Sequence, residues 1–348
     1  MQCMGPLGCW VMSSFAPLIE SVAAATQHRD RDALDASVAR LLFEFSEAER
    51  VTLSRVLGEG DEARVRHLLM LARGGTSPGV DEAADYAALP KLIDRADWMQ
   101  AVQSRDVVHL PATSKGGVHR SVFPLFGESS LHGLIEIESA RALDPRQAQL
   151  VLALLRVVRN HVAALEYGER DTLTGLLNRK TFDADFDKLR ARCARSQLSA
   201  PNWIGVVDID RFKSINDTYG HLFGDEVLLL VSRLMRAQVR AVDRLFRFGG
   251  EEFVVVIENV DEQTAAAVFE RIRAAIEHHL FPQIGTVTVS VGFSQIHPSD
   301  APAMAFARAD KALYHAKETG RNRVCAFEAL ALQGVLTRED AKSEIELF

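Results

Sequence analysis

The stretch RFGGEEF, residues 247–253, constrains the fold more than any other part of the chain, because two glycines and two carboxylates separate two strand-like runs. The run LFRF leads into it and FVVVI comes after it, and a Gly-Gly dipeptide between such runs predicts a β-hairpin. Glycine is favoured where φ is positive or where a ligand approaches the backbone closely. The hairpin would present Glu251 and Glu252, either as a solvated surface pair or as oxygen ligands of a metal that faces a polyanion.

Length and composition predict a soluble globular protein of about two domains, since the chain has 348 residues, 47% hydrophobic and 25% charged. The net charge of −7 argues against bulk binding to nucleic acid. The four cysteines, Cys3, Cys9, Cys193 and Cys325, lack metal-site spacing and indicate free thiols in a reducing compartment, the cytoplasm. We identify neither a signal peptide nor an apolar run of the roughly 18 residues that span a membrane.

The first half of the chain mixes helix and strand patterns. A helix is predicted within residues 15–45, followed by strands at 51–57, 65–71, 107–110, 121–125 and 133–138. Strand, turn and strand in SVFPLFGESSLHGLIEIES, with a long helix after them, resemble the end of a GAF sensory domain. That resemblance implies an antiparallel sheet that holds an unidentified small ligand. A dimerisation module without a ligand is the alternative, because the histidines in this half, His67, His109, His119 and His132, are typical of surface or core positions.

Residues 146–167 predict one long helix that starts after Pro145. Apolar side chains recur at heptad spacing, at Leu150, Leu154, Val157, His161 and Ala164. This stripe either packs on the first domain or pairs with its twin in a parallel coiled coil. In both cases a stiff helix between two domains can transmit a movement from one to the other.

The segment DTLTGLLNR, residues 171–179, is followed about seventy residues later by GGEEF, and this order and spacing resemble the GGDEF family of diguanylate cyclases. The resemblance runs over residues 171–327 and implies a ferredoxin-like βαββαβ fold related to polymerase palms. The hydrophobic pattern agrees, with helices expected at 180–193, 225–239, 262–279 and 303–319. Strands are expected at 204–209, 245–248, 253–257, 287–293 and 323–327.

The whole chain is therefore expected to be α+β, in five parts. Residues 1–13 are expected to be disordered, with Met12 as an alternative start. A GAF-like sensory or dimerisation domain covers 14–145, a signalling helix 146–170, and the GGDEF catalytic domain 171–328. Residues 329–348 form a polar tail without an assigned role.

Carboxylates at the end of the run WIGVVDID are candidate metal ligands, because a buried strand that ends in aspartate places charge at the edge of a sheet. By resemblance, Asp208, Glu251 and the Ile209 carbonyl hold two Mg²⁺ ions per site, or Mn²⁺ in their place. Glu252 is either a further ligand or the base that activates the attacking hydroxyl. Asp210 points to the other side of the strand and is expected to cap the next turn.

The resemblance also implies substrate contacts. Asn216 and Asp225 would bind the guanine edge, unless they are only a helix cap and a first-turn carboxylate. Lys317 and Arg321, in YHAKETGRN, would meet phosphates, although basic residues near a terminating glycine are also a common helix end. The predicted GTP-binding set is completed by Phe212, Lys213, Gly249 and Gly250, with Lys213 also serving catalysis.

A second site is indicated upstream of the hairpin, where Arg240 and Asp243 form an RxxD pattern six residues before Gly249. In the family this pattern belongs to an inhibitory product site, and Arg271 lies where a further arginine contributes. The alternative is a local surface ion pair that stabilises the fold by less than about 1 kcal/mol.

The implied reaction is the condensation of two GTP into cyclic di-GMP and two pyrophosphates, by a homodimer, with cyclic di-GMP as inhibitor. Alternatives are a degenerate domain that binds nucleotide without turnover, a domain that serves a phosphodiesterase partner, and a cyclase that uses ATP. Asn216 and Asp225 favour guanine over adenine, and the residues after Phe327 contain no hydrolase motif.

Overall fold

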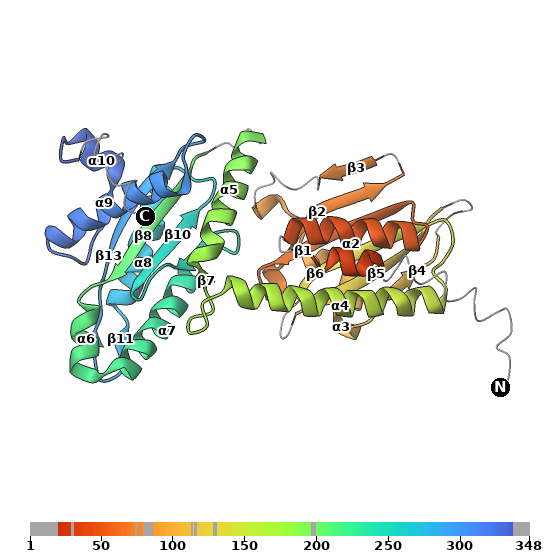
Figure 1. Cartoon of the computed structure of the whole chain (residues 1–348), viewed down its shortest axis with the longest axis horizontal. Coiled ribbons are helices and arrows are strands. Elements are labelled where there is room, and N and C mark those ends of the chain that lie inside the picture. Colours follow the sequence, from red (N-terminus) through yellow and green to blue (C-terminus); the bar gives the residue numbers. More distant parts are fainter. Residues whose placement is uncertain are drawn as a thin grey trace. The chain divides into compact units, whose positions relative to one another are not determined.

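The computed structural model describes residues 20–28, 31–73, 75–78, 86–112, 114, 117–127, 131–195 and 200–336. Two compact units divide the chain, Met1–Gly168 and Glu169–Phe348 (Figure 1). The predictions for residues 1–13 and for the tail after residue 336 fall outside the described residues.

The first unit is built on a six-stranded antiparallel sheet. The five predicted strands are all present, with ends shifted by at most two residues. A sixth short strand at the edge was not predicted. In spatial order the strands are β3 (Gly75–Pro78), β2 (Arg64–Ala72), β1 (Arg50–Leu57), β6 (Leu131–Ser139), β5 (His119–Phe126) and β4 (Val108–Leu110).

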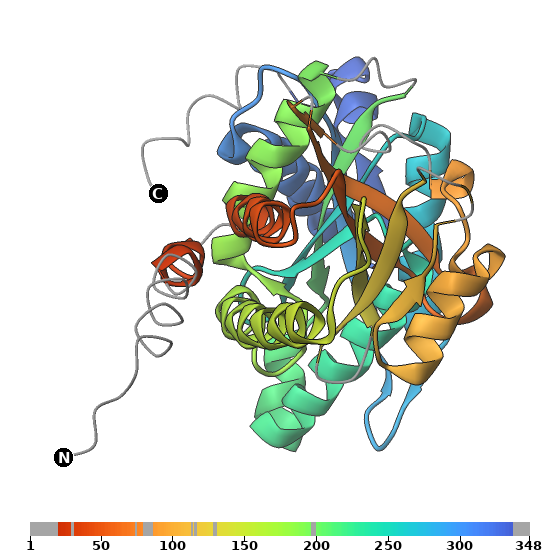
Figure 2. The same cartoon turned by 90° about the vertical axis from the view of Figure 1, so that its right-hand side faces the viewer.

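Helices cover both faces of this sheet (Figure 2). On one face α2 (Arg31–Phe45) and α4 (Pro145–Glu169) share a hydrophobic cluster with strand residues that include Ile135 and Ile137. On the other face α3 (Ala96–Ser104) packs Trp98 against Leu134, the neighbour of Ile135 that points the opposite way. The helix predicted within residues 15–45 is interrupted, since residues 26–28 are not helical. Short 3-10 turns occupy Gly60–Glu62, Tyr86–Ala88 and Leu92–Asp94.

Helix α4 begins with a capping box. The Asp144 carboxylate accepts hydrogen bonds from the amides of Arg146 and Gln147, each at 2.8 Å, while Gln147 Oε1 accepts from the Asp144 amide at 3.0 Å. Pro145 occupies the first helical position, so the helix begins one residue earlier than predicted.

The apolar stripe of α4 is divided between core and surface. Leu154 and Val158 are buried in the cluster shared with the sheet, so they pack on the first unit. Val157 remains 45% exposed. Among the described residues, α4 is also the one helix long and apolar enough to cross a bilayer, which corrects the expectation that no such run exists. Its contribution to the core is typical of a core helix in a globular unit.

The second unit has the predicted ferredoxin-like topology. Its sheet has the order β14-β13-β8-β10-β9-β7, and the four central strands are antiparallel. Along the chain these central strands and the helices between them follow the βαββαβ pattern. The strands are β7 (Leu177–Asn178), β8 (Asn202–Ile209), β9 (Arg244–Arg247), β10 (Glu252–Ile257), β13 (Val289–Ile296) and β14 (Val324–Ala326).

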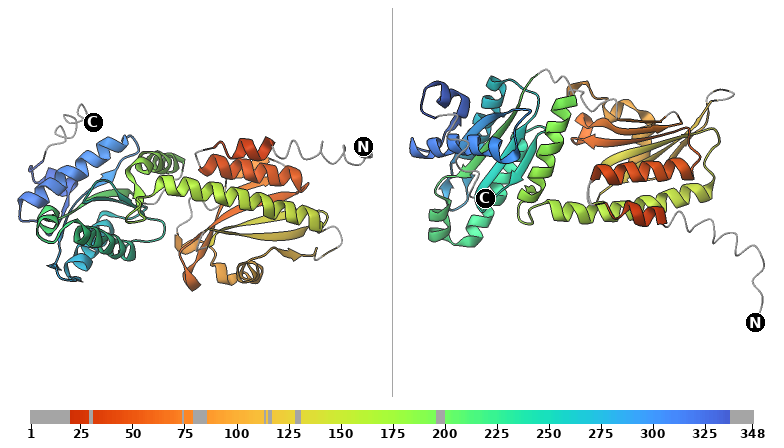
Figure 3. Two further views of the ribbon diagram at one scale, coloured as in Figure 1. Left: turned by 60° about the horizontal axis from the view of Figure 1, so that its bottom comes forward. Right: turned by 45° about the horizontal axis from the view of Figure 1, so that its top comes forward.

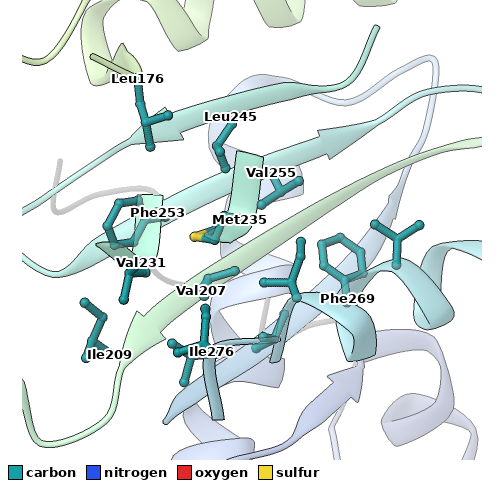
Figure 4. Close-up of a cluster of buried hydrophobic side chains, with 14 of the residues drawn as sticks. Leu176, Val207, Ile209, Val231, Met235, Leu245, Phe253, Val255, Phe269 and Ile276 are labelled. Atoms are coloured by element: carbon teal, nitrogen blue, oxygen red, sulfur yellow. The ribbon is translucent and has the colours of Figure 1, made fainter. Parts of the chain in front are cut away.

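Helices cover both faces of the second sheet (Figure 3), and each face has its own hydrophobic cluster. Figure 4 shows one of them, where Val207 and Val255 meet Met235 and Phe269. On the opposite face Val206 and its neighbours pack against other helices. The first face is covered by α7 (His221–Gln238) and α8 (Glu262–Glu277), the second by α5 (Arg179–Arg195) and α9 (Pro302–Glu318).

The region between β8 and β9 differs from prediction. Helix α6 (Phe212–Tyr219) was not predicted, and α7 starts at His221, four residues before the predicted start at Asp225. Gly220 alone separates the two helices, with φ of 91°. Smaller elements complete the unit: β11 (Leu280–Phe281), β12 (Gly285–Thr286) and α10 (Phe327–Leu332).

Candidate active site

The hairpin between β9 and β10 is fastened to the end of β8 by backbone hydrogen bonds. The amides of Phe248 and Gly249 both donate to the Glu252 carbonyl, at 2.8 and 3.3 Å. The Ile209 amide donates to the Glu251 carbonyl at 3.3 Å. The hairpin tip is therefore held beside the last residue of β8, which brings the two motifs together as the sequence predicts.

Positive φ, one of the two predicted reasons for the hairpin glycines, does not apply, and close approach of a ligand to the backbone stays a prediction. Neither Gly249 nor Gly250 is among the described residues with positive φ. A Cβ on Gly249 would lie 2.7 Å from Oε2 of Glu252, whereas a Cβ on Gly250 would meet nothing within 4 Å. The absence of a side chain at Gly249 therefore makes room for the carboxylate of Glu252.

Three carboxylates gather where β8 meets the hairpin. Asp208 and Glu252 are directly opposite in the antiparallel pair, so their side chains share one face of the sheet. Asp208 is only 4% exposed, and burial raises its pKa, opposed by Lys317 and reinforced by Glu252. Burial also raises the pKa of Glu251, with the negative charge of Asp208 as the next cause. Mutual repulsion of this kind is relieved by a bound cation.

The cation in contact with this cluster is a side chain of the protein. Lys317 Nζ, from the last turn of α9, lies 2.9 Å from Oδ2 of Asp208. Lys317 was predicted to contact the phosphates of GTP. In the structure its ammonium contacts the carboxylate of Asp208. Among the described residues, no group of three His, Cys, Asp or Glu side chains is already arranged to hold a metal ion.

Asp210 does not cap the next helix, which corrects the prediction. Helix α6 has no side-chain cap. Instead the Asp210 carboxylate, 7% exposed, accepts hydrogen bonds from the hydroxyls of Thr288 and Ser290, both at 2.7 Å, and from the Asn322 amide at 3.0 Å. These bonds satisfy a buried charge and join the end of β8 to the loop after α9.

The candidate guanine-binding residues lie on adjoining helices. Asn216 is half-buried on α6, and Asp225 is exposed on α7. A Cβ on Gly224 would lie 1.9 Å from Oδ1 of Asn216, so the glycine permits the two helices to approach at this point. Asn216 lies inside α6 and Asp225 is the fifth residue of α7, so neither is the helix cap or first-turn carboxylate of the alternative interpretation.

The candidate phosphate contacts differ in their surroundings. Lys213 and Arg321 are both exposed. Phe212 is not available for a side-chain contact with substrate, because it is 5% exposed and belongs to the hydrophobic core. Arg321 lies in a left-handed turn, with φ of 64° at Arg321 and 46° at Asn322.

A polar network holds this turn. Arg273 Nη1 donates to Oδ1 of Asn322 at 2.6 Å, and Asn322 Nδ2 donates to Glu277 at 2.6 Å. Arg273 also pairs with Glu270 and Glu277, at 2.6 and 2.7 Å. Positive φ costs free energy in residues other than glycine, and these contacts offset that cost beside Arg321.

The residues predicted for the second site lie around one loop. Asp243 is 2% exposed and accepts from the backbone amide of Arg240 at 2.8 Å and from its Nη2 at 3.1 Å. Arg240 Nη2 also donates to the Glu258 carbonyl at 2.7 Å. The exposed Arg271 donates to the carbonyl of Gln238, at the end of α7. Both arginines therefore hold the segment between α7 and β9.

Two positioning residues were missed, although their motifs were recognised. Asp171 Oδ1 accepts from the amide and hydroxyl of Thr174, at 2.8 and 2.7 Å, and Arg247 Nη1 donates to it at 3.0 Å. Arg247 Nη2 donates to the Gly250 carbonyl at 2.8 Å. Hydrogen bonds from Thr174 and Arg247 lower the pKa of Asp171, outweighing a burial effect that alone would raise it. The sequence signal that could have identified this pair is the opposite charge of Asp171 and Arg247, one in each motif.

The second unit matches a known family by sequence. Residues 169–323 match the model described as "Diguanylate cyclase, GGDEF domain". The chain is 35% identical over 160 residues to the diguanylate cyclase DgcZ of Escherichia coli, covering 45% of this chain and 52% of that protein. It is 41% identical over 159 residues to a diguanylate cyclase of Vibrio cholerae, covering 45% and 49%.

A longer match is to the diguanylate cyclase DgcP of Pseudomonas aeruginosa, 30% identical over 258 residues, covering 69% of this chain and 38% of that one. The chain thus spans about half, or less, of the length of these relatives.

Solved structures with similarity include the GGDEF domain of DgcB from Caulobacter crescentus in complex with c-di-GMP. It has 35% sequence identity and a TM-score of 0.43, covering 46% of this chain and 94% of that one. The active GGEEF domain of a diguanylate cyclase from Vibrio cholerae has 39% identity and a TM-score of 0.41, covering 44% and 97%. By sequence, residues 169–323 of this chain are therefore similar to the GGDEF domains of diguanylate cyclases.

Proposed function

We propose that the protein is a diguanylate cyclase that condenses two GTP into cyclic di-GMP and two pyrophosphates. The observation that carries this proposal is the meeting of Asp208, Glu251 and Glu252 with Lys317 at the end of β8, inside a GGDEF domain. GTP is an intracellular nucleotide, and we accordingly propose that the protein works in the cytoplasm.

The donor set fits a hard divalent cation, because carboxylate and carbonyl oxygens are the ligands that Mg²⁺ prefers. Asp208, Glu251 and the Ile209 carbonyl would hold the metal, with Glu252 as a further ligand or as base, and we propose two Mg²⁺ or Mn²⁺ ions per site. When bound, the cation neutralises the carboxylates and the phosphates and favours ionisation of the attacking hydroxyl. Since Lys317 now contacts Asp208, its movement to the triphosphate would accompany loading of the site.

The covalent step is a phosphoryl-type substitution that occurs twice. The 3′-hydroxyl oxygen of one GTP bonds to the α-phosphorus of the other, and the bond from that phosphorus to pyrophosphate breaks. The hydroxyl proton passes to a base, for which we assign Glu252. Lys213, Lys317 and Arg321 supply positive charge to the phosphates as pyrophosphate leaves.

Base selection is assigned to Asn216 and Asp225. A carboxylate accepts hydrogen bonds from N1–H and the exocyclic amine of guanine, and adenine offers no such pair of donors. Competition between GTP and ATP tests this assignment, because equal use of both nucleotides would assign the protein to another cyclase class.

Dimerisation follows from the reaction, because each GGDEF domain is proposed to present one GTP to the other. We further propose a GAF-like identity for the first unit, supported by its six-stranded antiparallel sheet with helices on both faces. The loop held by Arg240, Asp243 and Arg271 is proposed as the inhibitory site for cyclic di-GMP. Arg271→Ala would then weaken product inhibition without lowering the initial rate.

The decisive experiment is incubation of the purified full chain with GTP and Mg²⁺, with identification of the product by mass spectrometry. Cyclic di-GMP and pyrophosphate are expected, and Glu251→Ala is expected to lower the rate about 10²–10⁴-fold. GTP binding without any cyclic dinucleotide would favour the degenerate-domain alternative.

A further inference from the structure

The first unit contains a cavity that the proposed reaction does not use. Its volume is ≈ 80 Å³, and it lies between helices α2 and α4 and the strands β1, β5 and β6. The two helices run side by side over the sheet (Figure 3). The cavity belongs entirely to the unit Met1–Gly168.

The floor of the cavity is apolar. Val38 of α2, Leu53 of β1, Ile135 of β6 and Leu155 and Val158 of α4 all line it. Each of these side chains is at most 8% exposed. A floor of this kind gains free energy by excluding water from an aliphatic or aromatic group.

The rim of the cavity is positively charged. Among the described lining residues, Arg31 of α2, Arg55 of β1 and Arg159 of α4 carry positive charge and Asp35 carries negative charge. Arg55 Nη2 and Asp35 Oδ2 are 3.5 Å apart, at the outer limit of a hydrogen bond. This excess of positive charge contrasts with the whole chain, whose net charge is −7. The local field therefore favours an anion.

A histidine forms part of the cavity wall. A Cβ on Gly127 would lie 2.1 Å from Nε2 of His132, so the imidazole lies across the backbone of Gly127, and both residues line the cavity. The cavity suits a small molecule and is too small for a nucleotide.

We propose that this cavity binds a small amphipathic carboxylate, with its anionic head at the arginine rim and a short aliphatic tail on the apolar floor. A carboxylate matches the planar guanidinium of arginine in two parallel hydrogen bonds. The apolar floor distinguishes such a ligand from inorganic phosphate, which has no tail to bury.

The position of the cavity indicates how such a ligand would act. Helix α4 supplies Leu155, Val158, Arg159, Val162 and Ala163 to its wall, and the same helix leads directly into residue 169, where the GGDEF domain begins. A bound carboxylate would stabilise one packing of α4 on the sheet. This regulatory role rests on the proposed cyclase function, whereas the binding itself does not.

The test is calorimetric titration of the full chain with three probes: hexanoate, hexanamide and acetate. Hexanoate has both head and tail, hexanamide lacks the charge, and acetate lacks the tail. We expect hexanoate to bind at least about 10-fold more tightly than either of the others. Equal affinity for hexanoate and hexanamide, or no hexanoate binding up to about 10 mM, overturns the proposal.

Two variants and one control locate the site. Arg159→Gln is expected to weaken hexanoate binding about 5- to 20-fold, because Arg159 is exposed at the rim. Ala163→Leu fills the cavity and is expected to abolish binding. Arg156→Gln, exposed on the same helix outside the cavity, is expected to bind as the parent does. Equal losses in Arg156→Gln and Arg159→Gln would place the ligand elsewhere and refute the site.

A second readout separates the two proposals. The rate of GTP turnover is measured with and without hexanoate in the parent and in Arg159→Gln. A change in rate that Arg159→Gln removes supports regulation through α4. Saturable hexanoate binding without any GTP turnover leaves the cavity proposal standing and removes the proposed function.

Discussion

Single residues at the end of β8 determine how charge is balanced in the second unit. Lys317 pairs with Asp208, since Nζ of the lysine and Oδ2 of the carboxylate lie 2.9 Å apart. The same lysine is proposed to serve the phosphates of GTP. One ammonium cannot neutralise both Asp208 and the phosphates of GTP. A metal bound at Asp208 would leave Lys317 available to the phosphates, so the metal and GTP are each expected to raise the affinity for the other.

The first prediction concerns Lys317→Gln. Removing the ammonium leaves Asp208 without its cation, so Mn²⁺ measured without nucleotide should bind up to about 5-fold more tightly, while GTP binds more weakly. Free Mn²⁺ measured by electron paramagnetic resonance gives the affinity. Lys311→Gln on the same helix is the control. Unchanged Mn²⁺ affinity in Lys317→Gln would show that the ion pair does not compete with the metal.

A second residue-scale prediction follows from Asp171, whose pKa is lowered by Thr174 and Arg247. A lowered pKa stabilises the folded state above the usual aspartate pKa of about 3.9, and this contribution is lost as pH falls through the folded-state pKa. Asp171→Asn should therefore reduce the free energy of unfolding by about 1 kcal/mol at pH 7. The difference should vanish in acid.

Urea unfolding at pH 7 and near pH 3 measures this difference, with the exposed Asp183→Asn as control. A deficit of the same size at both pH values would mean that the aspartate acts through its shape and not through its charge.

At the scale of elements, the approach of α6 to α7 depends on one position without a side chain. A Cβ on Gly224 would lie 1.9 Å from Oδ1 of Asn216. Gly224→Ala should displace Asn216 and raise KM for GTP about 10-fold, with a smaller effect on kcat, because the lost contact is one of binding. Steady-state kinetics with GTP and with ATP measure this, and discrimination between them should fall.

The exposed Glu226→Ala on α7 is the control for that substitution. A loss of kcat with KM unchanged in Gly224→Ala would contradict the assignment of Asn216 to base binding.

The elements show where sequence patterns suffice and where they do not. Strands β1, β8 and β10 were predicted because continuous or alternating apolar residues mark them. Helix α6 was missed because it has only eight residues, so its core-facing side chains, Phe212 and Ile215, mark a single turn. The start of α7 was placed late because His221 and the 82% exposed Leu222 do not face the core.

Sequence predicted those residues of the candidate site that lie within recognised motifs, but not the contacts between distant motifs. The neighbourhood of Asp208 and Glu252 follows from the family pattern, and the strand register places them opposite each other. The contact of Lys317 with Asp208 joins residues more than one hundred positions apart, and no local pattern specifies it. Phe212 was assigned to substrate by its place in a motif, whereas its side chain is needed by the core.

At the scale of the whole molecule, we expect the two units to fold and to act independently, because each forms its own compact unit. The hydrophobic clusters of the second unit contain only its own residues, so residues 169–348 alone should fold cooperatively. Without the first unit, pairing of two GGDEF domains should depend on concentration. Specific activity should then rise with protein concentration over the micromolar range, while the full chain shows a weaker dependence.

Comparing specific activity across a 100-fold range of concentration, for both proteins, tests this prediction. Identical concentration dependence would mean that the first unit contributes nothing to assembly.

The contacts of Arg247 with Asp171 and with the Gly250 carbonyl bear on how chains of this kind exchange their first domain in evolution. Asp171 lies in the turn at the start of the second unit. Its ion pair with Arg247 attaches this turn to the hairpin between β9 and β10. We therefore expect that an exchange of the first unit for a different leading domain would have to preserve this aspartate and its arginine.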